Sequence, residues 1–293
     1  MARARRDKPG APLLRHGACR RRKPSGDRLS TRWPTVNAIA TAWSVELLKL
    51  RRSVVAWVVT PLLVVIVPLA SVGSVALARS PDLSGPAAGK FGAFATGPLA
   101  VACLEVCGQI LSVATLGAGG FAAAWTFGRE FGEGTVGALF GLPVPRRSIA
   151  LAKGLLLLCW LTACVLLAVA VTIGASMVVG GKLGPDAWLA AGIGLGAGSL
   201  GVGLALPFAW VATVTRSALG TAGVLVGLVA VTQVIVVLGA GSWFPYAVPS
   251  LWAGAGGPEA SAGIGPAAVL LTAAVAPAGL AAVGWAWARL SDV

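Results

Sequence analysis

FGREFGEGTVGALFGLPVPRRSIALAK, residues Phe127 to Lys153, is a polar stretch with an apolar segment on each side that is long enough to cross a bilayer. Within it, Val136, Leu139 and Phe140 recur at positions i, i+3 and i+4, which predicts a short amphipathic helix. A segment of this kind lies at the membrane surface and presents one side to a partner in the cytosol.

Charged and turn-forming residues surround this short helix. Glu130 and Glu133 precede it, whereas Pro143 and Pro145 follow it and should end it, because proline lacks a donor and restricts the residue before it. Ser148 is the predicted N-cap of the next helix. The basic residues of the stretch are Arg129, Arg146, Arg147 and Lys153.

The composition indicates a membrane protein. Of the 293 residues, 57% are hydrophobic and only 11% are charged, whereas a soluble domain averages about 25% charged residues. Apolar runs recur along the chain, each near the length of about 20 residues that a spanning helix needs. We therefore predict an all-α polytopic protein with six transmembrane helices, near Ser53–Ala78, Leu99–Phe127, Gly154–Gly180, Ala187–Val214, Ser217–Ala240 and Ala267–Ala288. A glycine cluster in the second run, at residues 117–120, is expected to kink or break it.

The chain divides into an N-terminal tail and a membrane domain that begins with an interfacial helix. Residues 1–35 are predicted to be a disordered basic cytoplasmic tail, and residues 36–293 a single six-span domain. From Val36 to Arg52 the pattern becomes helical, which predicts an amphipathic helix lying in the membrane interface. Its apolar stripe consists of Val36, Ile39, Trp43, Leu47 and Leu50.

The distribution of basic residues predicts the orientation. Of the 23 Lys and Arg residues, all but Arg79, Lys90 and Lys182 fall on the side of the N-terminus in a six-span arrangement. The positive-inside rule then places both termini and the Phe127–Lys153 stretch in the cytosol. This placement explains the net charge of +13 without a nucleic-acid partner and implies contact with membrane lipid.

Tryptophans near the predicted span ends agree with this layout. Indole rings favour the headgroup level of a bilayer, so we expect these residues to act as interfacial anchors. They are Trp125, Trp160, Trp188, Trp210, Trp285 and Trp287.

Glu105 is the acidic residue that falls deep in a predicted span. With Gln109 four residues on, and so on the same helical face, it forms a candidate intramembrane polar site. Alternatively, the span begins later and Glu105 lies at the outer interface. Both interpretations stay open at this point.

The sequence offers no motif for a cofactor, a metal or catalysis. It contains no GxxxxGK[ST], so any ATP must be bound by another polypeptide. GAGSLG at residues 196–201 has the spacing of a dinucleotide fingerprint but lies inside an apolar run. Gly192, Gly194, Gly196 and Gly198 instead form two overlapping GxxxG pairs, which predict close helix packing within the subunit rather than at a dimer face. The single histidine, His16, lies in the tail.

Two segments resemble the permease subunits of ABC-2 type transporters, in particular the small six-span permeases of bacitracin- and lantibiotic-resistance exporters. They are ELLKLRRS at residues 46–53 and REFGEGTVGALFGLPVPRRSIALAKG at residues 129–154. Pro145 departs from that pattern, which has a polar residue before the basic pair. The matching positions are Glu130, Gly134–Thr135, Leu142–Pro143, Arg146–Arg147 and Lys153.

The resemblance implies a transport subunit rather than an enzyme. A separate cytosolic ABC ATPase would dock against the amphipathic helix and a cytosolic coupling helix between spans two and three. A second permease, either another copy or a paralogue, would complete a dimer in the plasma membrane of a bacterium, exporting a drug, antibiotic or peptide. The implied ATPase-coupling surface is Glu130, Glu133, Gly134, Thr135, Phe140, Leu142, Pro143, Arg146 and Arg147.

Two other classes of protein compete with this interpretation. A secondary transporter, or another polytopic protein without an ATPase partner, would show internal repeats with matched broken helices, and no convincing repeat is visible. A membrane enzyme would need clustered polar catalytic residues near the bilayer, and this inventory is poor. A gene for an ABC ATPase next to the gene for this chain would favour an ABC permease over both a secondary transporter and a membrane enzyme.

Overall fold

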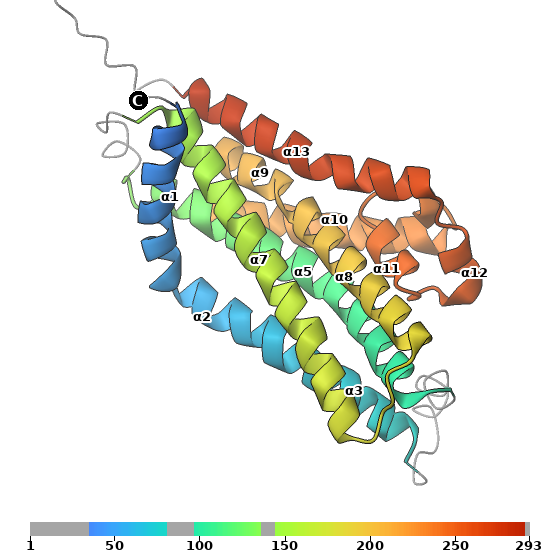
Figure 1. Cartoon of the computed structure of the whole chain (residues 1–293). Helices are drawn as coiled ribbons and strands as arrows, with labels where there is room; N and C mark the ends of the chain where they lie inside the picture. Colours follow the sequence, from blue (N-terminus) through green and yellow to red (C-terminus); the bar gives the residue numbers. More distant parts are fainter. Residues whose placement is uncertain (1–34, 81–96, 136–143, 291–293) are drawn as a thin grey trace, which may run out of the picture. The chain divides into compact units, whose positions relative to one another are not determined.

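The structure is a computed structural model that describes residues 35–80, 97–135 and 144–290. All of these belong to one compact unit, Trp33–Val293. Within the described ranges every regular element is helical and no strand occurs, which confirms the predicted fold class (Figure 1). In chain order the elements are α1 (Thr35–Arg51), α2 (Val54–Pro61), η1 (Leu62–Ile66), α3 (Val67–Ala78), α5 (Leu99–Gly132), α7 (Arg146–Val178), α8 (Pro185–Ala205), α9 (Pro207–Thr215), α10 (Ala218–Val237), η3 (Gly241–Trp243), α11 (Val248–Trp252), α12 (Gly257–Ala262) and α13 (Pro266–Ala288).

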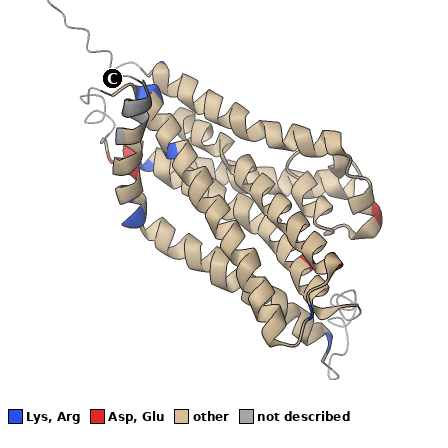
Figure 2. Cartoon of the chain, viewed as in Figure 1, with Lys and Arg blue, Asp and Glu red and all other residues tan. Residues whose placement is uncertain are grey.

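Six candidate membrane spans correspond to the six predicted runs. Among the described residues they are Val54–Ala78, Leu99–Gly132, Arg146–Val178, Pro185–Thr215, Ala218–Val237 and Pro266–Ala288. Lys and Arg gather at the end of the bundle where α1 lies, while the middle of the bundle is almost free of charge (Figure 2). This is the charge pattern that a hydrocarbon layer around the middle of the helices requires.

The second and third spans are longer than hydropathy predicts. α5 continues past Phe127 to Gly132, and α7 begins at Arg146 rather than near Gly154. The prediction that Ser148 caps α7 is wrong. Pro145, with ψ at 130°, is the last extended residue, and Ser148 is buried within the first turn. Proline fixes φ and has no N–H that needs a partner, so it is tolerated just before a helix, although it offers no capping side chain.

The glycine cluster does not break the second span. α5 runs without interruption through residues 117–120 and packs mainly along α8. The two backbones meet closely: a Cβ on Gly108 would lie 3.0 Å from Gly194 Cα, and Thr115 Oγ1 donates to the Gly198 carbonyl at 3.1 Å. The Gly194–Gly198 pair of α8 therefore serves helix packing within the chain, whereas Gly192 of the other pair has open space around it.

Prolines interrupt two other spans. The first contains a π-helical turn, Leu62–Ile66, shortly before Pro68. Proline clashes with the carbonyl four residues earlier, and a wider turn relieves that clash. The fourth span changes from α8 to α9 at Leu206, because Pro207 cannot donate back along the helix.

Helix α1 packs against α7 through its polar side. Ala42 and Glu46 are buried, whereas Trp43 and Leu50 of the predicted apolar stripe are half-buried and Leu47 is 37% exposed. The helix is confirmed, but the face turned to the bundle is the row Ala42–Glu46–Lys49, at spacings of four and three residues. This row places the charged side chains of Glu46 and Lys49 against the bundle.

Candidate functional site

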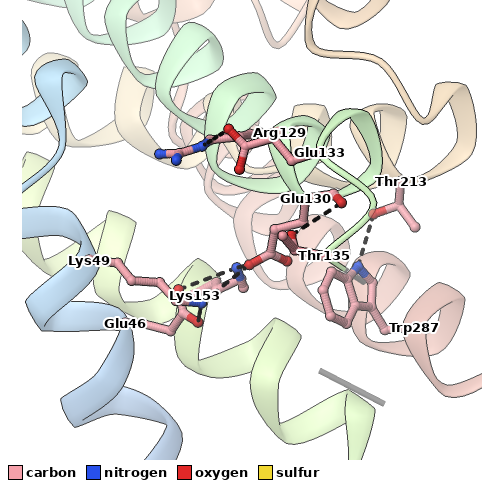
Figure 3. A network of polar contacts seen from close by, with 9 residues as sticks. All are labelled: Glu46, Lys49, Arg129, Glu130, Glu133, Thr135, Lys153, Thr213 and Trp287. Atoms are coloured by element: carbon pink, nitrogen blue, oxygen red, sulfur yellow. Dashed lines mark hydrogen bonds and ion pairs between the residues drawn. The ribbon is translucent and has the colours of Figure 1, made fainter. Parts of the chain in front are cut away.

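A buried ammonium group lies at the end of the bundle where α1, α5 and α7 meet (Figure 3). Lys153, on α7, is 1% exposed. Its Nζ contacts Glu130 Oε1 on α5 and lies 3.3 Å from Glu46 Oε2 on α1. A buried charge is tolerated only when it is paired, so each of these helices depends on the other two here.

Lys49 closes the cluster from the surface. Its Nζ donates to Glu46 Oε1 at 2.8 Å and to Glu130 Oε1 at 3.4 Å, and its side chain is about half exposed. Partial burial opposes the charge, but the hydrogen bond to Glu46 and the two nearby carboxylates outweigh it and raise the pKa of Lys49. Two ammonium groups thus balance two carboxylates, and we call Glu46, Lys49, Glu130 and Lys153 the ion network.

Aromatic rings enclose the network on the side of α13. Trp287, fully buried, meets the Phe127 ring edge to face with centroids 5.9 Å apart. The Lys153 ammonium lies 5.8 Å from the centre of the Phe127 ring and 5.9 Å from that of Trp287. Cation–π attraction and exclusion of water both strengthen the pairing of Lys153.

Trp287 is not an interfacial anchor, contrary to the prediction. Its Nε1 donates to Thr213 Oγ1 on α9 at 3.0 Å (Figure 3). A buried indole N–H needs such an acceptor. Trp287 therefore fastens α13 and α9 to the ion network.

The Gly134–Thr135 pair ends α5. Gly134 has φ at +67°, its N–H donates to the Phe131 carbonyl at 3.3 Å, and the Thr135 N–H donates to the Glu130 carbonyl at 3.1 Å. These bonds form a Schellman motif, whose left-handed residue is usually glycine because a Cβ there is strained. The pair stops the helix just after Glu130 and so sets the position of that carboxylate.

Other predicted coupling residues lie outside the network. Glu133 pairs with Arg129 at 2.7 Å on the surface, where a pair contributes about 0–1 kcal/mol. Arg146 donates to the Leu290 carbonyl, and Arg147 is exposed. Phe140, Leu142 and Pro143 lie outside the described residues, as does the predicted short helix.

The structure places Glu105 far from the ion network. It is an exposed residue near the start of α5. The 25-residue separation from Glu130 corresponds to about 37 Å along a helix, which exceeds the hydrocarbon thickness of about 30 Å. With Glu130 at one surface, this length favours the outer interface for Glu105. Gln109 is half-buried, and its Nε2 would lie 3.5 Å from a Cβ on Gly254.

A pocket of about 630 Å³ opens beside the ion network. Glu130 is among its lining residues, and the Oε2 atom of Glu130 is a buried oxygen without a hydrogen-bond partner among the described residues. The pocket is lined by Glu46, Lys49, Leu50, Arg52, Ser53, Trp125, Thr126, Arg129, Glu130, Glu133, Thr135, Lys153, Leu156 and Leu157.

Sequence reasoning missed Glu46 and Lys49 as site residues and treated Lys153 only as part of a motif. A signal was present, because Glu46 and Lys49 stand three apart in a helix that otherwise carries an apolar stripe. However, the partners of Glu46 and Lys49 lie on helices that are distant in sequence, and no local sequence pattern identifies those partners.

Six apolar spans, two of them joined to α1 at one end by a buried ion network, define a polytopic helical membrane protein whose sequence contains no ATP-binding motif. Residues 43–239 match the model of the family described as ABC-2 family transporter protein, and the chain belongs to this family. It is the membrane component, or permease, of an ABC-2 transporter and has no ATPase activity of its own. Permeases of this family generally pair with an ATP-binding subunit. No curated protein matches the chain.

Proposed function

We propose that the chain is the permease of an ATP-driven exporter, oriented with the ion network at the cytosolic surface. The charge distribution supports this orientation, because the positive-inside rule assigns the basic end to the cytosol. Arg79 and Lys182 belong to the opposite end of the described spans. The basic residues at the network end are Lys49, Arg51, Arg52, Arg129, Arg146, Arg147, Lys153, Arg216 and Arg289.

The observation that carries the proposal is the joining of α1, α5 and α7 by Lys153. The ATP-binding subunit docks against α1 and the Phe127–Lys153 stretch, which are the two segments that the network connects. ATP-driven movement at either segment therefore reaches α5 and α7 together. Coupling between subunits requires such a contact, because the permease binds no nucleotide itself.

The residues of the coupling surface divide into two roles in this proposal. Phe140, Leu142 and Pro143 supply apolar anchors to a groove on the ATP-binding subunit, and Glu133, Arg146 and Arg147 set the register as rim charges. Glu130, Gly134 and Thr135 act inside the permease by positioning the ion network.

The finer assignment rests on the resemblance to bacitracin- and lantibiotic-resistance permeases. By it, the cargo is a drug, antibiotic or peptide. Two permeases, as a homodimer or a pair of paralogues, line its route across a bacterial plasma membrane. The predominantly apolar spans and the scarcity of charge within them suit an amphiphilic cargo better than a small ion.

The test is co-expression with a candidate ATP-binding subunit, followed by measurement of co-purification, ATP hydrolysis and survival against a panel of drugs and antimicrobial peptides. Phe140→Ala should weaken co-purification, since a fully enclosed aromatic contributes on the order of 3 kcal/mol. Glu130→Gln should leave co-purification intact and uncouple ATP hydrolysis from resistance. In this variant Lys153 keeps Glu46 as its partner.

Glu133→Gln is the matched control, because Glu133 is an exposed carboxylate one turn from Glu130. It should retain both docking and coupling. Normal docking and normal resistance in the Phe140 and Glu130 variants alike, at equal membrane levels, would remove this surface from the mechanism.

A further inference from the structure

The ion network divides into two neutral halves along the boundary between α1 and the α5–α7 pair. Within α1, Lys49 Nζ lies 2.8 Å from Glu46 Oε1. On the other side, Lys153 of α7 contacts Glu130 of α5 (Figure 3). Two further contacts cross the boundary, and at 3.3 and 3.4 Å both are longer than the pair within α1. Separation along this boundary leaves every charge of the network with a partner, so it avoids the cost of an uncompensated buried charge.

The pocket of about 630 Å³ lies along the same boundary. Leu50 and Ser53 line it from α1 and the corner that follows α1, whereas Trp125 lines it from α5 and Leu156 from α7. The side chain of Lys49 is about half exposed, so water reaches the boundary from one side. Because of this void, α1 gives up fewer packing contacts on leaving the boundary than it would at a close-packed one.

The first span is irregular in its middle. Between α2 and α3, the π-helical turn Leu62–Ile66 is closed by a bond from the Val67 N–H to the Leu62 carbonyl, five residues earlier. Pro61 precedes this turn and Pro68 follows it, and neither has an N–H to donate back along the helix. The span therefore loses regular backbone bonds here, and π turns and prolines are the places where helices bend.

The two parts of the first span are attached differently to the bundle. α3 packs along both α5 and α7, whereas α2 contacts mainly α1 and the π-helical turn that follows it. Two of the eight residues of α2 are buried, Val55 and Val59, and Trp57 is 74% exposed. Trp160 Nε1 on α7 donates to Thr60 Oγ1 at 3.2 Å and fixes the end of α2 beside the π-helical turn. α2 is thus held at its two ends, by this bond and, through α1, by the ion network.

We propose that α1 and α2 form an arm that swings as one unit about the π-helical turn, and that the contacts between the two halves of the ion network are its latch. With the latch closed, Glu46 lies at Lys153 and the arm is fixed to α5 and α7. With the latch open, each half keeps its internal pair, Thr60 stays at Trp160, and α3 stays in place.

The role of the arm in transport rests on the proposed function, in which the ATP-binding subunit docks against α1. A pull from that subunit on α1 is transmitted to α5 and α7 while the latch is closed, and is taken up by the bend in the first span once the latch is open. The hinge and the latch are properties of the permease alone, so they can be measured without the ATP-binding subunit.

The experiment measures distances between paired spin labels on the full-length chain in lipid nanodiscs, in a cysteine-free background. One pair joins Val54→Cys on α2 to Leu166→Cys on α7, and the reference pair joins Leu77→Cys on α3 to the same position on α7. All three side chains are exposed, so the labels do not displace packed residues. The reference pair reports whether the bundle itself stays intact.

The double variant Glu46→Gln, Lys49→Gln opens the latch. It keeps the net charge and leaves Lys153 paired with Glu130. The population with a displaced α2 should rise about tenfold, which corresponds to one charge-assisted hydrogen bond. The displacement should be about 5 Å, since a bend of about 20° acts over the roughly 15 Å of helix between the π-helical turn and Val54. The distance between α3 and α7 should stay unchanged.

The double variant Arg129→Gln, Glu133→Gln is the matched control, because it removes another charge pair that lines the same pocket but lies within α5. It should leave both distances unchanged. Pro68→Ala, added to the latch variant, restores a backbone N–H to the first span and removes the clash of the proline ring. The displaced population should then fall back to that of the unaltered chain.

An unchanged distance between α2 and α7 in the latch variant would overturn the proposal. So would an equal shift at both label pairs, an equal shift in the matched control, or a displaced population that persists with Pro68→Ala. The measurement uses neither ATP nor cargo, so its failure is distinguishable from failure of the proposed function.

Discussion

Lys153 and Glu130 form a buried ion pair between α7 and α5, and the same ammonium reaches Glu46 on α1. The rings of Phe127 and Trp287 lie beside the Lys153 ammonium, which is almost fully buried. Removal of one member of such a buried pair is far more costly than loss of a surface pair, since the remaining charge stays buried.

Lys153→Met should destabilise the chain by about 3–5 kcal/mol, because Glu46 and Glu130 then share only the half-exposed Lys49. Thermal unfolding in detergent measures the effect. The double variant Lys153→Met, Glu130→Gln should recover part of the loss, since Glu46 keeps Lys49 and no uncompensated carboxylate remains. Arg147→Met, an exposed change on the same helix, should stay within about 0.5 kcal/mol. A double variant less stable than Lys153→Met would contradict an electrostatic origin of the effect.

Gly128→Ala should destabilise the contact between α5 and the start of α10. A Cβ there would lie 2.6 Å from the backbone nitrogen of Ala218, so one of the two backbones has to move. Overpacking of this kind costs about 1–3 kcal/mol. Gly117→Ala, in the same helix with open space around the new methyl group, should instead be neutral or stabilising by up to about 1 kcal/mol. Equal melting temperatures for the two variants would exclude close packing at Gly128.

Trp287 and Thr213 should be energetically coupled through their hydrogen bond. A double-mutant cycle with Trp287→Phe and Thr213→Val should give a coupling energy of about 0.5–1.5 kcal/mol in thermal unfolding. Trp285→Phe changes an exposed indole two residues away, so its effect on the free energy of unfolding should add to that of Thr213→Val without coupling. A coupling energy near zero for the Trp287 pair would show that the hydrogen bond contributes nothing to stability.

The proposed orientation can be tested by labelling single cysteines in a cysteine-free background. Arg147→Cys and Glu259→Cys place exposed thiols at opposite ends of the spans. An impermeant maleimide added to intact cells should label position 259 and leave 147 unlabelled until the cells are opened. Labelling of both positions from outside would be incompatible with the six-span orientation.

Hydropathy was sufficient to predict the spans, because crossing a bilayer imposes length and apolarity on each helix independently. Hydropathy was insufficient to predict where the helices end beside the ion network. There α5 continues to Gly132 and α7 starts at Arg146, since a Schellman motif and an extended proline, rather than polarity, end these helices.

The site was predictable only in part. Glu130 was identified from its motif, but its role was assigned to an exposed surface, whereas it is 8% exposed. Glu46 falls outside the apolar stripe predicted for α1, and an amphipathic helix usually buries that stripe rather than its polar side. In the structure Leu47 of that stripe stays exposed, and the charged row instead faces the bundle, where Glu46 pairs with Lys153.

The order of charges along the chain has a consequence for biosynthesis. Both carboxylates that contact Lys153 precede it, Glu130 by 23 residues. A growing chain therefore presents the two acids before the ribosome adds the base, and α7 enters the membrane with partners for its ammonium group already in place. A rearranged gene encoding α7 ahead of α1 and α5 would have to insert that charge alone, at a cost of about 2.5–3.5 kcal/mol at the centre of a bilayer and less near its surface.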